Sequence, residues 1–353
     1  MPPTLSLVNL FLTDEDDNIA GDLLSNKIGW IDNLRAVACM MVVMIHATTY
    51  YVTSGVAVGE HNWDIANLLN SMSRVSVPLF FMISGYLFFG EKSAGKKHFI
   101  RIGCCILFYS AIALIYIATF TKIGFWPSLR GMLLKPVFYH LWFFYAIAVI
   151  YLLSPLINVK PVSRRYLAAV LVILAVIANP NTSPLALGNA HLLPVNLYIY
   201  GDTFYYLLYA LAGRAIGMMD TQGRGISWLA ASGFVFSVAL IIHGTKSQMF
   251  INGNFADTYY IYCGPLVFIA AVSLLIWFKN CLPEPIGWLG VFSRHSLAIY
   301  GFHAIIVNFM RNRHLELTAH PLLDIFWVFG VALALSLLLS IGLQKIDPRR
   351  LVS

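Results

Sequence analysis

The chain has 353 residues, of which 59% are apolar and only 11% are charged, and its mean hydropathy is +0.74. Soluble domains carry about a quarter charged residues, so this composition excludes an ordinary soluble fold and predicts a protein whose partners are membrane lipids. The net charge of +7 could suggest nucleic acid, but the cations lie in short clusters between apolar runs and no nucleic-acid-binding motif occurs, so no such partner is expected.

Residues 1–26 form a segment apart. A short apolar stretch, Leu5–Leu12, is followed by four acidic residues over 14–17. The stretch is too short to span a bilayer and lacks the basic start and cleavage site of a signal peptide. We predict a disordered acidic tail without a function of its own, followed by one transmembrane domain over residues 27–353.

Beyond this tail, apolar runs alternate with short polar breaks. A helix that crosses the hydrocarbon core needs about 20 apolar residues. The pattern therefore predicts an all-α integral membrane protein with about ten transmembrane helices. The predicted spans cover residues 34–52, 68–89, 99–121, 138–158, 165–179, 203–220, 226–243, 258–278, 295–311 and 322–344.

The basic residues predict the orientation of these helices. With the N-terminus placed inside, 16 of the 23 lysines and arginines fall in inside segments, and the long outside segment between Asn179 and Asp202 contains none. Cytoplasmic segments are enriched in such residues. Both termini are therefore expected in the cytoplasm.

The first span carries Arg35 and His46, eleven residues apart. This spacing returns them to nearly the same helix face, about 16 Å apart along the axis. Arg35 then lies at the cytoplasmic mouth, where a cation suits a phosphate-bearing ligand, and His46 lies near mid-membrane, where it suits acid–base or acyl-transfer chemistry. An interfacial anchor plus a histidine that hydrogen-bonds between helices explains the spacing equally well.

The second span contains Arg74, Pro78, Ser84 and Gly85. Pro78 should kink the helix, and the small residues permit close helix approach. Arg74 is expected at or just inside the outer end of the span. Its alternative interpretation is an interfacial arginine beside a packing motif.

The ninth span contains Ser296, Tyr300 and His303, which share one helix face. His303 would lie about 12 Å from the cytoplasmic end, a depth similar to that of His46. Two mid-depth histidines on different helices could meet in one cavity. A histidine–tyrosine pair used only for packing is the alternative.

Aromatic residues open the fourth span at its outer end, over residues 139–145. Most fit an interfacial belt, but His140 and Trp142 are interpreted as contacts for a sugar substrate. Asp202 and Asp257 would lie near the outer surface as helix caps or as ligands of sugar hydroxyls.

The inner loop that holds Lys92 and Arg101 is basic. The positive-inside rule explains it, and it could also attract donor phosphates. The five cysteines form no CxxC pair and are interpreted as small buried residues, so no metal site is expected. The sequence has no P-loop, HExxH or GxSxG with partners.

Together these motifs carry a family resemblance. The arginine followed after ten residues by histidine, the segment RVSVPLFFMISGYL, the segment HLWFF and the segment SLAIYGFH resemble the landmarks of the membrane acyltransferase-3 family. The likeness runs from about Trp30 to the C-terminus. It implies a multi-pass protein of the bacterial inner membrane.

The resemblance also implies an activity and roles for individual residues. The implied reaction is acetyl transfer from acetyl-CoA to a hydroxyl of a surface-glycan sugar, with N-acetylglucosamine of enterobacterial common antigen as the expected acceptor. His46 would be the base or transient acyl carrier, with His303 and Tyr300 beside it as catalytic residues. The implied donor-binding residues are Arg35, Asp32, Arg74, Ser84, Lys92 and Arg101.

Other functions stay open at this point. A transporter or flippase for a lipid-linked sugar also has about ten spans, although such proteins usually show inverted repeats with broken helices. The acceptor could be a different surface glycan, the donor could be succinyl-CoA, and a homo-oligomer is possible.

Overall fold

A computed structural model describes residues 28–132, 134–178, 186–187, 190–191, 202–317 and 319–353. The described chain is helical, as predicted, apart from one two-residue antiparallel strand pair. The predicted acidic tail lies outside the described residues.

In chain order the elements are α2 (Gly29–Thr53), η3 (Gly55–Val58), α3 (Glu60–Ser73), α4 (Ser76–Phe88), α5 (Lys96–Phe120), α6 (Phe125–Gly131), η4 (Tyr139–Leu141), α7 (Trp142–Leu153), η5 (Ser154–Leu156), α8 (Arg164–Ala178), β1 (Ala186–Leu187), β2 (Ala190–His191), α9 (Asp202–Met218), α10 (Arg224–Asn252), α11 (Pro265–Cys281), α12 (Gly287–Asn312) and α13 (Pro321–Ile346).

Six helical segments among the described residues are long and apolar enough to cross a membrane. They are Gly29–Thr53, Glu60–Phe88, Lys96–Phe120, Tyr139–Leu156, Arg224–Asn252 and Pro321–Ile346. The other four predicted spans coincide with α8, α9, α11 and α12, which are shorter or more polar. The structure therefore supports a multi-pass membrane protein, while the number of ten spans and their orientation stay predictions.

A break at Arg74 and Val75 divides the second predicted span into α3 and α4. Pro78 has no N–H to donate to the carbonyl oxygen of Arg74 one turn earlier, so the helix is interrupted at that point. The helix before the break begins at Glu60, not at residue 68. Arg74 therefore lies inside a 29-residue candidate span, which corrects the expectation that it lies near the outer end.

Three other boundaries differ from the sequence prediction. Helix α10 continues to Asn252, and α12 begins at Gly287, eight residues before the predicted start. Helix α11 begins at Pro265, where the fixed φ of proline suits a first helical turn. The residues before it form turns closed by bonds such as Tyr260 N–H to Asp257 O at 2.7 Å, so Asp257 lies in a turn and does not cap a helix.

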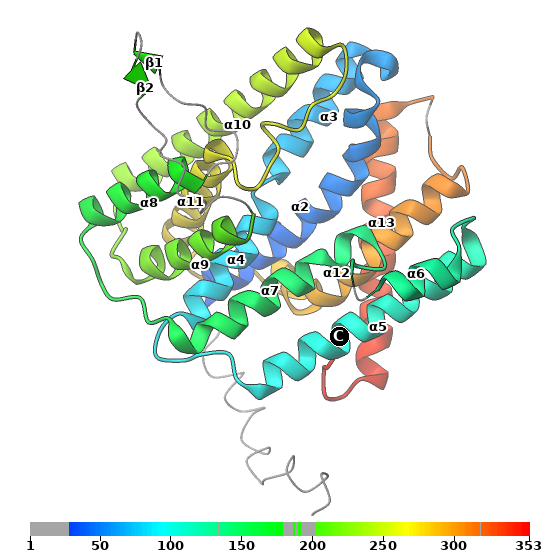
Figure 1. Ribbon diagram of the computed structural model, residues 1–353, viewed down its shortest axis with the longest axis horizontal. Coiled ribbons are helices and arrows are strands. Elements are labelled where there is room, and N and C mark those ends of the chain that lie inside the picture. The colour runs from blue at the N-terminus through cyan, green and yellow to red at the C-terminus, as the bar shows by residue number, and fades with distance from the viewer. Residues whose placement is uncertain (1–27, 133, 179–185, 188–189, 192–201, 318) are drawn as a thin grey trace, which may run out of the picture.

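Helix α2 lies at the centre of the bundle, between α3 and α4 on one side and α12 and α13 on the other (Figure 1). Its small and apolar residues Leu34, Ala38, Val43 and Ala47 are fully or almost fully buried. A helix buried on several sides is expected to be apolar around most of its circumference. Polar side chains on the buried faces of α2 are therefore held between neighbouring helices.

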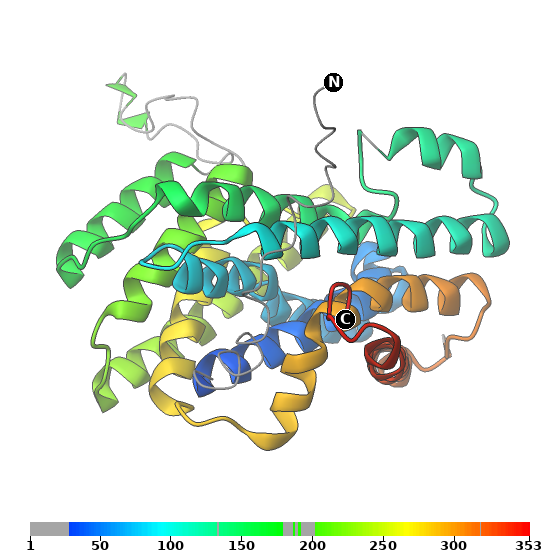
Figure 2. The same ribbon diagram turned by 90° about the horizontal axis from the view of Figure 1, so that it is seen from below.

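The segment after α13 folds back onto α5, beside which the chain ends in Figure 2. The Asp347 carboxylate accepts hydrogen bonds from the backbone N–H groups of Leu351, Val352 and Ser353. These bonds lower the pKa of Asp347, although its partial burial acts in the opposite direction. The turn thus presents its carbonyl oxygens to α5, where the Tyr109 hydroxyl donates to Val352 O at 2.6 Å.

Helices α4 and α9 approach each other at backbone distance. A Cβ atom on Gly85 would overlap the carbonyl oxygen of Ala210, and one on Gly213 would overlap the carbonyl oxygen of Met82. Small residues allow such contact between membrane helices, as the sequence predicts for Gly85. The contact fixes α4, and with it the break at Arg74, against the rest of the bundle.

Replacing Gly213 with alanine should destabilise the protein by about 1–3 kcal/mol, because the added methyl group forces the two backbones apart. The thermal midpoint of detergent-purified protein measures this loss. Gly342→Ala is the matched control, since a Cβ on Gly342 in α13 meets no atom within 4 Å. Equal midpoints for the two variants would contradict the close contact.

Candidate functional site

His46 on α2 and His303 on α12 meet inside the bundle. Their ring centroids lie 5.0 Å apart. His303 has no exposed surface, and His46 is half-buried. The two histidines that the sequence placed at similar depth are therefore neighbours.

His140 joins them from the 3-10 turn η4. Its ring centroid lies 5.4 Å from that of His303, and only 1% of the residue is exposed. The interpretation of His140 as a sugar contact stays a prediction. Tyr139, which the sequence analysis did not single out, is 52% exposed and packs 5.2 Å from the His46 ring. The histidine cluster is thus His46, His140 and His303, with Tyr139 between it and the surface.

Backbone carbonyls fix the tautomers of two of these histidines. Nδ1 of His303 lies 2.7 Å from Tyr300 O and 3.1 Å from Ile299 O, and Nε2 of His140 lies 3.1 Å from Gly301 O. A carbonyl only accepts, so each of these nitrogens carries its ring's hydrogen. The opposite nitrogens, His303 Nε2 and His140 Nδ1, are buried lone pairs without a hydrogen-bond partner in the described part of the chain.

Tyr300 holds the cluster together. Its hydroxyl donates to the carbonyl oxygen of His140, and its ring lies 5.6 Å from that of His303. The predicted catalytic hydroxyl is therefore engaged with the backbone. Tyr300 positions η4 against α12, which keeps the three imidazoles in contact.

Arg74 reaches the cluster from the break between α3 and α4. Its guanidinium lies 4.3 Å from the centroid of the Tyr260 ring and close enough to act electrostatically on His46. Within the described ranges Arg74 forms no ion pair with a carboxylate. An unpaired arginine in the membrane interior is costly, which favours a role in function.

Asn70 sets the position of Arg74. Its Oδ1 accepts from Arg74 Nε at 2.7 Å, while its Nδ2 donates to Thr48 Oγ1 at 2.9 Å and to Ile45 O at 3.3 Å on α2. The sequence analysis missed Asn70, although a signal was present. The residues Asn67, Asn70, Ser71 and Arg74 follow helical spacing, which predicts one polar face.

Arg35 forms a second cluster toward the other end of α2. It donates to Asp32 Oδ1 at 3.2 Å, and the same oxygen accepts from Ser293 Oγ at 2.9 Å. Asp32 and Arg35, both among the implied donor-binding residues, are thus in direct contact. The side chain of Arg35 stays 28% exposed, so its remaining donors are accessible.

Three further polar residues lie around Arg35. Tyr151 on α7 and Arg101 on α5 are within electrostatic range of it, and Tyr151 also interacts with Ser84. Arg101 donates to Ser353 O at 2.9 Å, and Lys92 is exposed in the loop before α5. Asp32, Ser84 and Arg101, three of the donor-side residues named from sequence, thus lie around Arg35, whereas Arg74 lies toward the histidines. Tyr151 is an addition that the sequence analysis missed among many interfacial aromatics.

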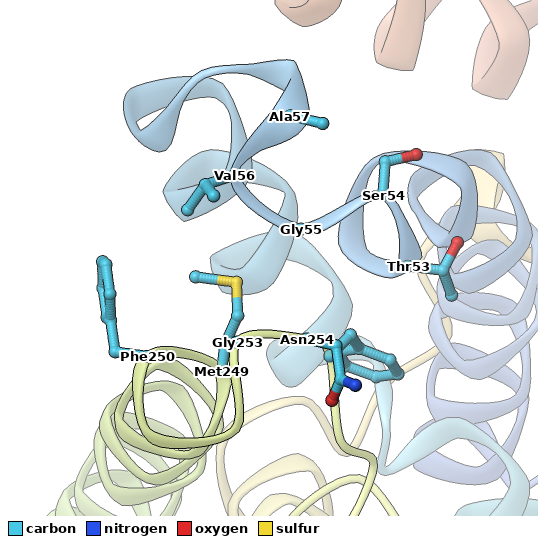
Figure 3. A pocket seen from close by; sticks show the side chains of 10 residues that line it. Thr53, Ser54, Gly55, Val56, Ala57, Met249, Phe250, Gly253 and Asn254 are labelled. Atoms are coloured by element: carbon cyan, nitrogen blue, oxygen red, sulfur yellow. The ribbon is translucent and has the colours of Figure 1, made fainter.

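A pocket of about 300 Å³ lies beyond the end of α2 (Figure 3). Thr53, Val56, Met249 and Phe255 are among its lining residues, and none of the lining side chains is titratable. Its lining therefore offers hydroxyl groups, from Thr53 and Ser54, but no general acid or base to activate them. Among the described residues, no three His, Cys, Asp or Glu side chains are placed to hold a metal ion.

Comparison with known proteins identifies the chain's family. A profile of the acyltransferase-3 family, described as an acyltransferase domain, matches residues 28–343. The chain belongs to this acyltransferase family. The matched region contains both the histidine cluster and the Arg35 cluster, so both are features of an acyltransferase domain.

Two curated proteins match part of this acyltransferase. A serine/alanine racemase of Enterococcus gallinarum is 30% identical over 156 residues, which are 39% of this chain and 21% of that protein. An amino-acid racemase of Enterococcus faecalis is 28% identical over 134 residues, which are 34% and 18% respectively. The chain spans about a fifth of the length of these relatives. No solved structure matches.

Replacing Asn70 with leucine should lower acyl-transfer turnover about tenfold or more, because Arg74 loses a hydrogen bond of the charge-assisted kind. Turnover and thermal midpoint are measured together on purified protein. Ser73→Ala is the control, since the Ser73 hydroxyl only bonds Leu69 O in its own helix. The thermal midpoint should also fall somewhat, because Ile45 O and Thr48 Oγ1 lose a donor, and unchanged turnover of the folded variant would contradict a positioning role.

Proposed function

We propose that the chain is a multi-pass O-acetyltransferase of the bacterial inner membrane, which moves the acetyl group of acetyl-CoA to a hydroxyl of a surface-glycan sugar. The observation that carries this proposal is that one helix, α2, bears Arg35 in a polar cluster and His46 beside a second histidine. Family membership supports acyl transfer, and six long apolar helices support the membrane location.

The Arg35 cluster is proposed as the donor site. CoA carries phosphates, and a guanidinium already oriented by Asp32 offers them directed N–H donors. Arg101 adds positive charge nearby, Lys92 is proposed to attract donor phosphates from the loop before α5, and the excess of cations in the same predicted loops supports a cytoplasmic location. The roughly 16 Å between Arg35 and His46 lets an extended pantetheine arm reach from one cluster to the other.

The histidine cluster is proposed as the site of transfer. The sugar oxygen bonds to the acetyl carbon as the carbon–sulfur bond to CoA breaks. His46 takes the hydroxyl proton and returns it to the departing thiolate, or carries the acetyl group in transit. The free lone pair of His303 Nε2 can accept a hydrogen bond that orients the reacting groups. Arg74 can stabilise the negative charge that develops on the carbonyl oxygen.

The acceptor is proposed to be an N-acetylglucosamine residue of enterobacterial common antigen, on the strength of the motif resemblance. It would approach from the periplasmic end, where Tyr139 is exposed beside His46. Trp142 begins the helix that follows and is proposed as a sugar contact. A homo-oligomer is compatible with this arrangement and is not required by it.

Replacing His46 with alanine should reduce acetyl transfer by about 10²–10⁴-fold, because the base or acyl carrier is lost. The acetyl content of surface glycans, measured by mass spectrometry in a complemented deletion strain, reports this loss. His243→Ala is the control, since His243 is exposed on α10. Full acetylation in His46→Ala would overturn the mechanism, and glycan movement without CoA release would indicate a transporter.

Replacing Arg35 with alanine should weaken acetyl-CoA binding about tenfold or more, because charge-assisted hydrogen bonds to the donor phosphates are removed. Calorimetry on purified protein gives the dissociation constant. Arg294→Ala is the matched control, because Arg294 is an exposed arginine on α12 that donates to Gly290 O. Equal affinity in the Arg35 and Arg294 variants would remove Arg35 from the donor site.

A further inference from the structure

Three aromatic rings form a layered platform beside the histidine cluster. Trp142 on α7 stacks on Tyr206 of α9 at 5.5 Å, and Tyr262, in the turns before α11, lies 6.1 Å from Trp142. Tyr206 in turn stacks on Phe81 of α4 at 4.4 Å. Tyr206 is 6% exposed, whereas Trp142 and Tyr262 are half-buried. Tyr206 is thus packed against the protein interior, whereas Trp142 and Tyr262 keep accessible surface.

Opposite charges flank this aromatic platform. Asp202, the exposed first residue of α9, lies within electrostatic range of Tyr206 and Tyr262, and the half-buried Arg74 lies within range of Tyr262. Neither Asp202 nor Arg74 forms an ion pair in the part of the chain that the structure describes. A purely structural aromatic core requires no such charged groups. Their presence indicates a ligand with polar groups at its edges and apolar faces.

The platform is also adjacent to the transfer site. Arg74 acts on both Tyr262 and His46, so one guanidinium connects the two. On the other side, Phe143 follows Trp142 in α7 and packs 5.3 Å from Tyr300 of the histidine cluster. Phe143 thereby connects Trp142 of the platform, at 6.3 Å, to Tyr300 of the histidine cluster.

We propose that Trp142 and Tyr262, with Asp202 and Arg74, form the subsite that binds the pyranose ring of the acceptor. This inference rests on the proposed function and names the part of the site that selects the substrate. The C–H face of a sugar packs on aromatic rings, the Asp202 carboxylate accepts from hydroxyl or acetamido N–H groups, and Arg74 donates to ring oxygens. A lipid acyl chain would match the rings but not the two charges.

The test uses full-length protein in lipid nanodiscs with a tetrasaccharide of β-linked N-acetylglucosamine as the probe. Binding is measured by calorimetry, and transfer from radiolabelled acetyl-CoA gives separate KM values for sugar and donor. Trp142→Ala should weaken tetrasaccharide binding and raise its KM about tenfold, since an aromatic contact contributes stacking and apolar burial. The KM for acetyl-CoA should change much less.

Two further variants separate binding from misfolding. Trp142→Phe keeps an aromatic face and should recover part of the affinity for the tetrasaccharide. Trp277→Ala is the control, because Trp277 is a half-buried tryptophan that packs on Phe278 in α11, and its sugar KM should equal that of the wild type.

Unchanged sugar affinity in Trp142→Ala overturns the subsite, and so does a wild type that cleaves acetyl-CoA but does not bind the tetrasaccharide. A wild type that binds the tetrasaccharide without consuming acetyl-CoA contradicts the proposed acetyl transfer and leaves the sugar subsite standing.

Discussion

Asn70 connects the first two helical segments of the bundle at the depth where the chemistry is expected. Its amide donates to Ile45 O and Thr48 Oγ1 of α2, one residue before and two residues after His46, and its oxygen holds Arg74 at the end of α3. In a bilayer a polar group without a protein partner is expensive, so this network is satisfied only when the two helices are in register. The relative positions of His46 and Arg74 follow from that register, and the transfer site is built around them.

Two arginines, Arg311 and Arg74, lie in contrasting surroundings within the bundle. Arg311 on α12 pairs with Asp324 of α13 at 2.7 Å, and the Tyr51 hydroxyl donates to the same carboxylate oxygen. That carboxylate has no exposed surface, so the contact ties α2, α12 and α13 together. Arg74 instead donates to the side-chain amide of Asn70 and lies over the ring of Tyr260, and it has no carboxylate partner in the described chain. The first arrangement stabilises the fold, and the second leaves a charge available to a ligand.

Hydropathy and helical periodicity predicted the helical segments and the shared face of Arg35 and His46, because both depend on local sequence. The similar depths of His46 and His303 could also be estimated by counting residues. The burial of His140 could not, because an aromatic segment at a helix start has the same composition whether it faces lipid or protein. The polar face of α3 was missed because hydropathy averaged along the sequence does not reveal four polar residues on one side of an otherwise apolar helix. The predicted span therefore began too late, and Arg74 was placed near its outer end.

The fixed tautomers of His303 and His140 have a consequence for the membrane itself. An imidazole passes a proton along a chain by receiving it at one nitrogen and releasing it from the other. In both rings one nitrogen is bound to a backbone carbonyl, which cannot supply a replacement hydrogen. His303 and His140 can therefore take up a proton at the free nitrogen and give it back to a bound reactant, but neither passes a proton through its ring. Histidines at mid-depth are thus compatible with an energised membrane.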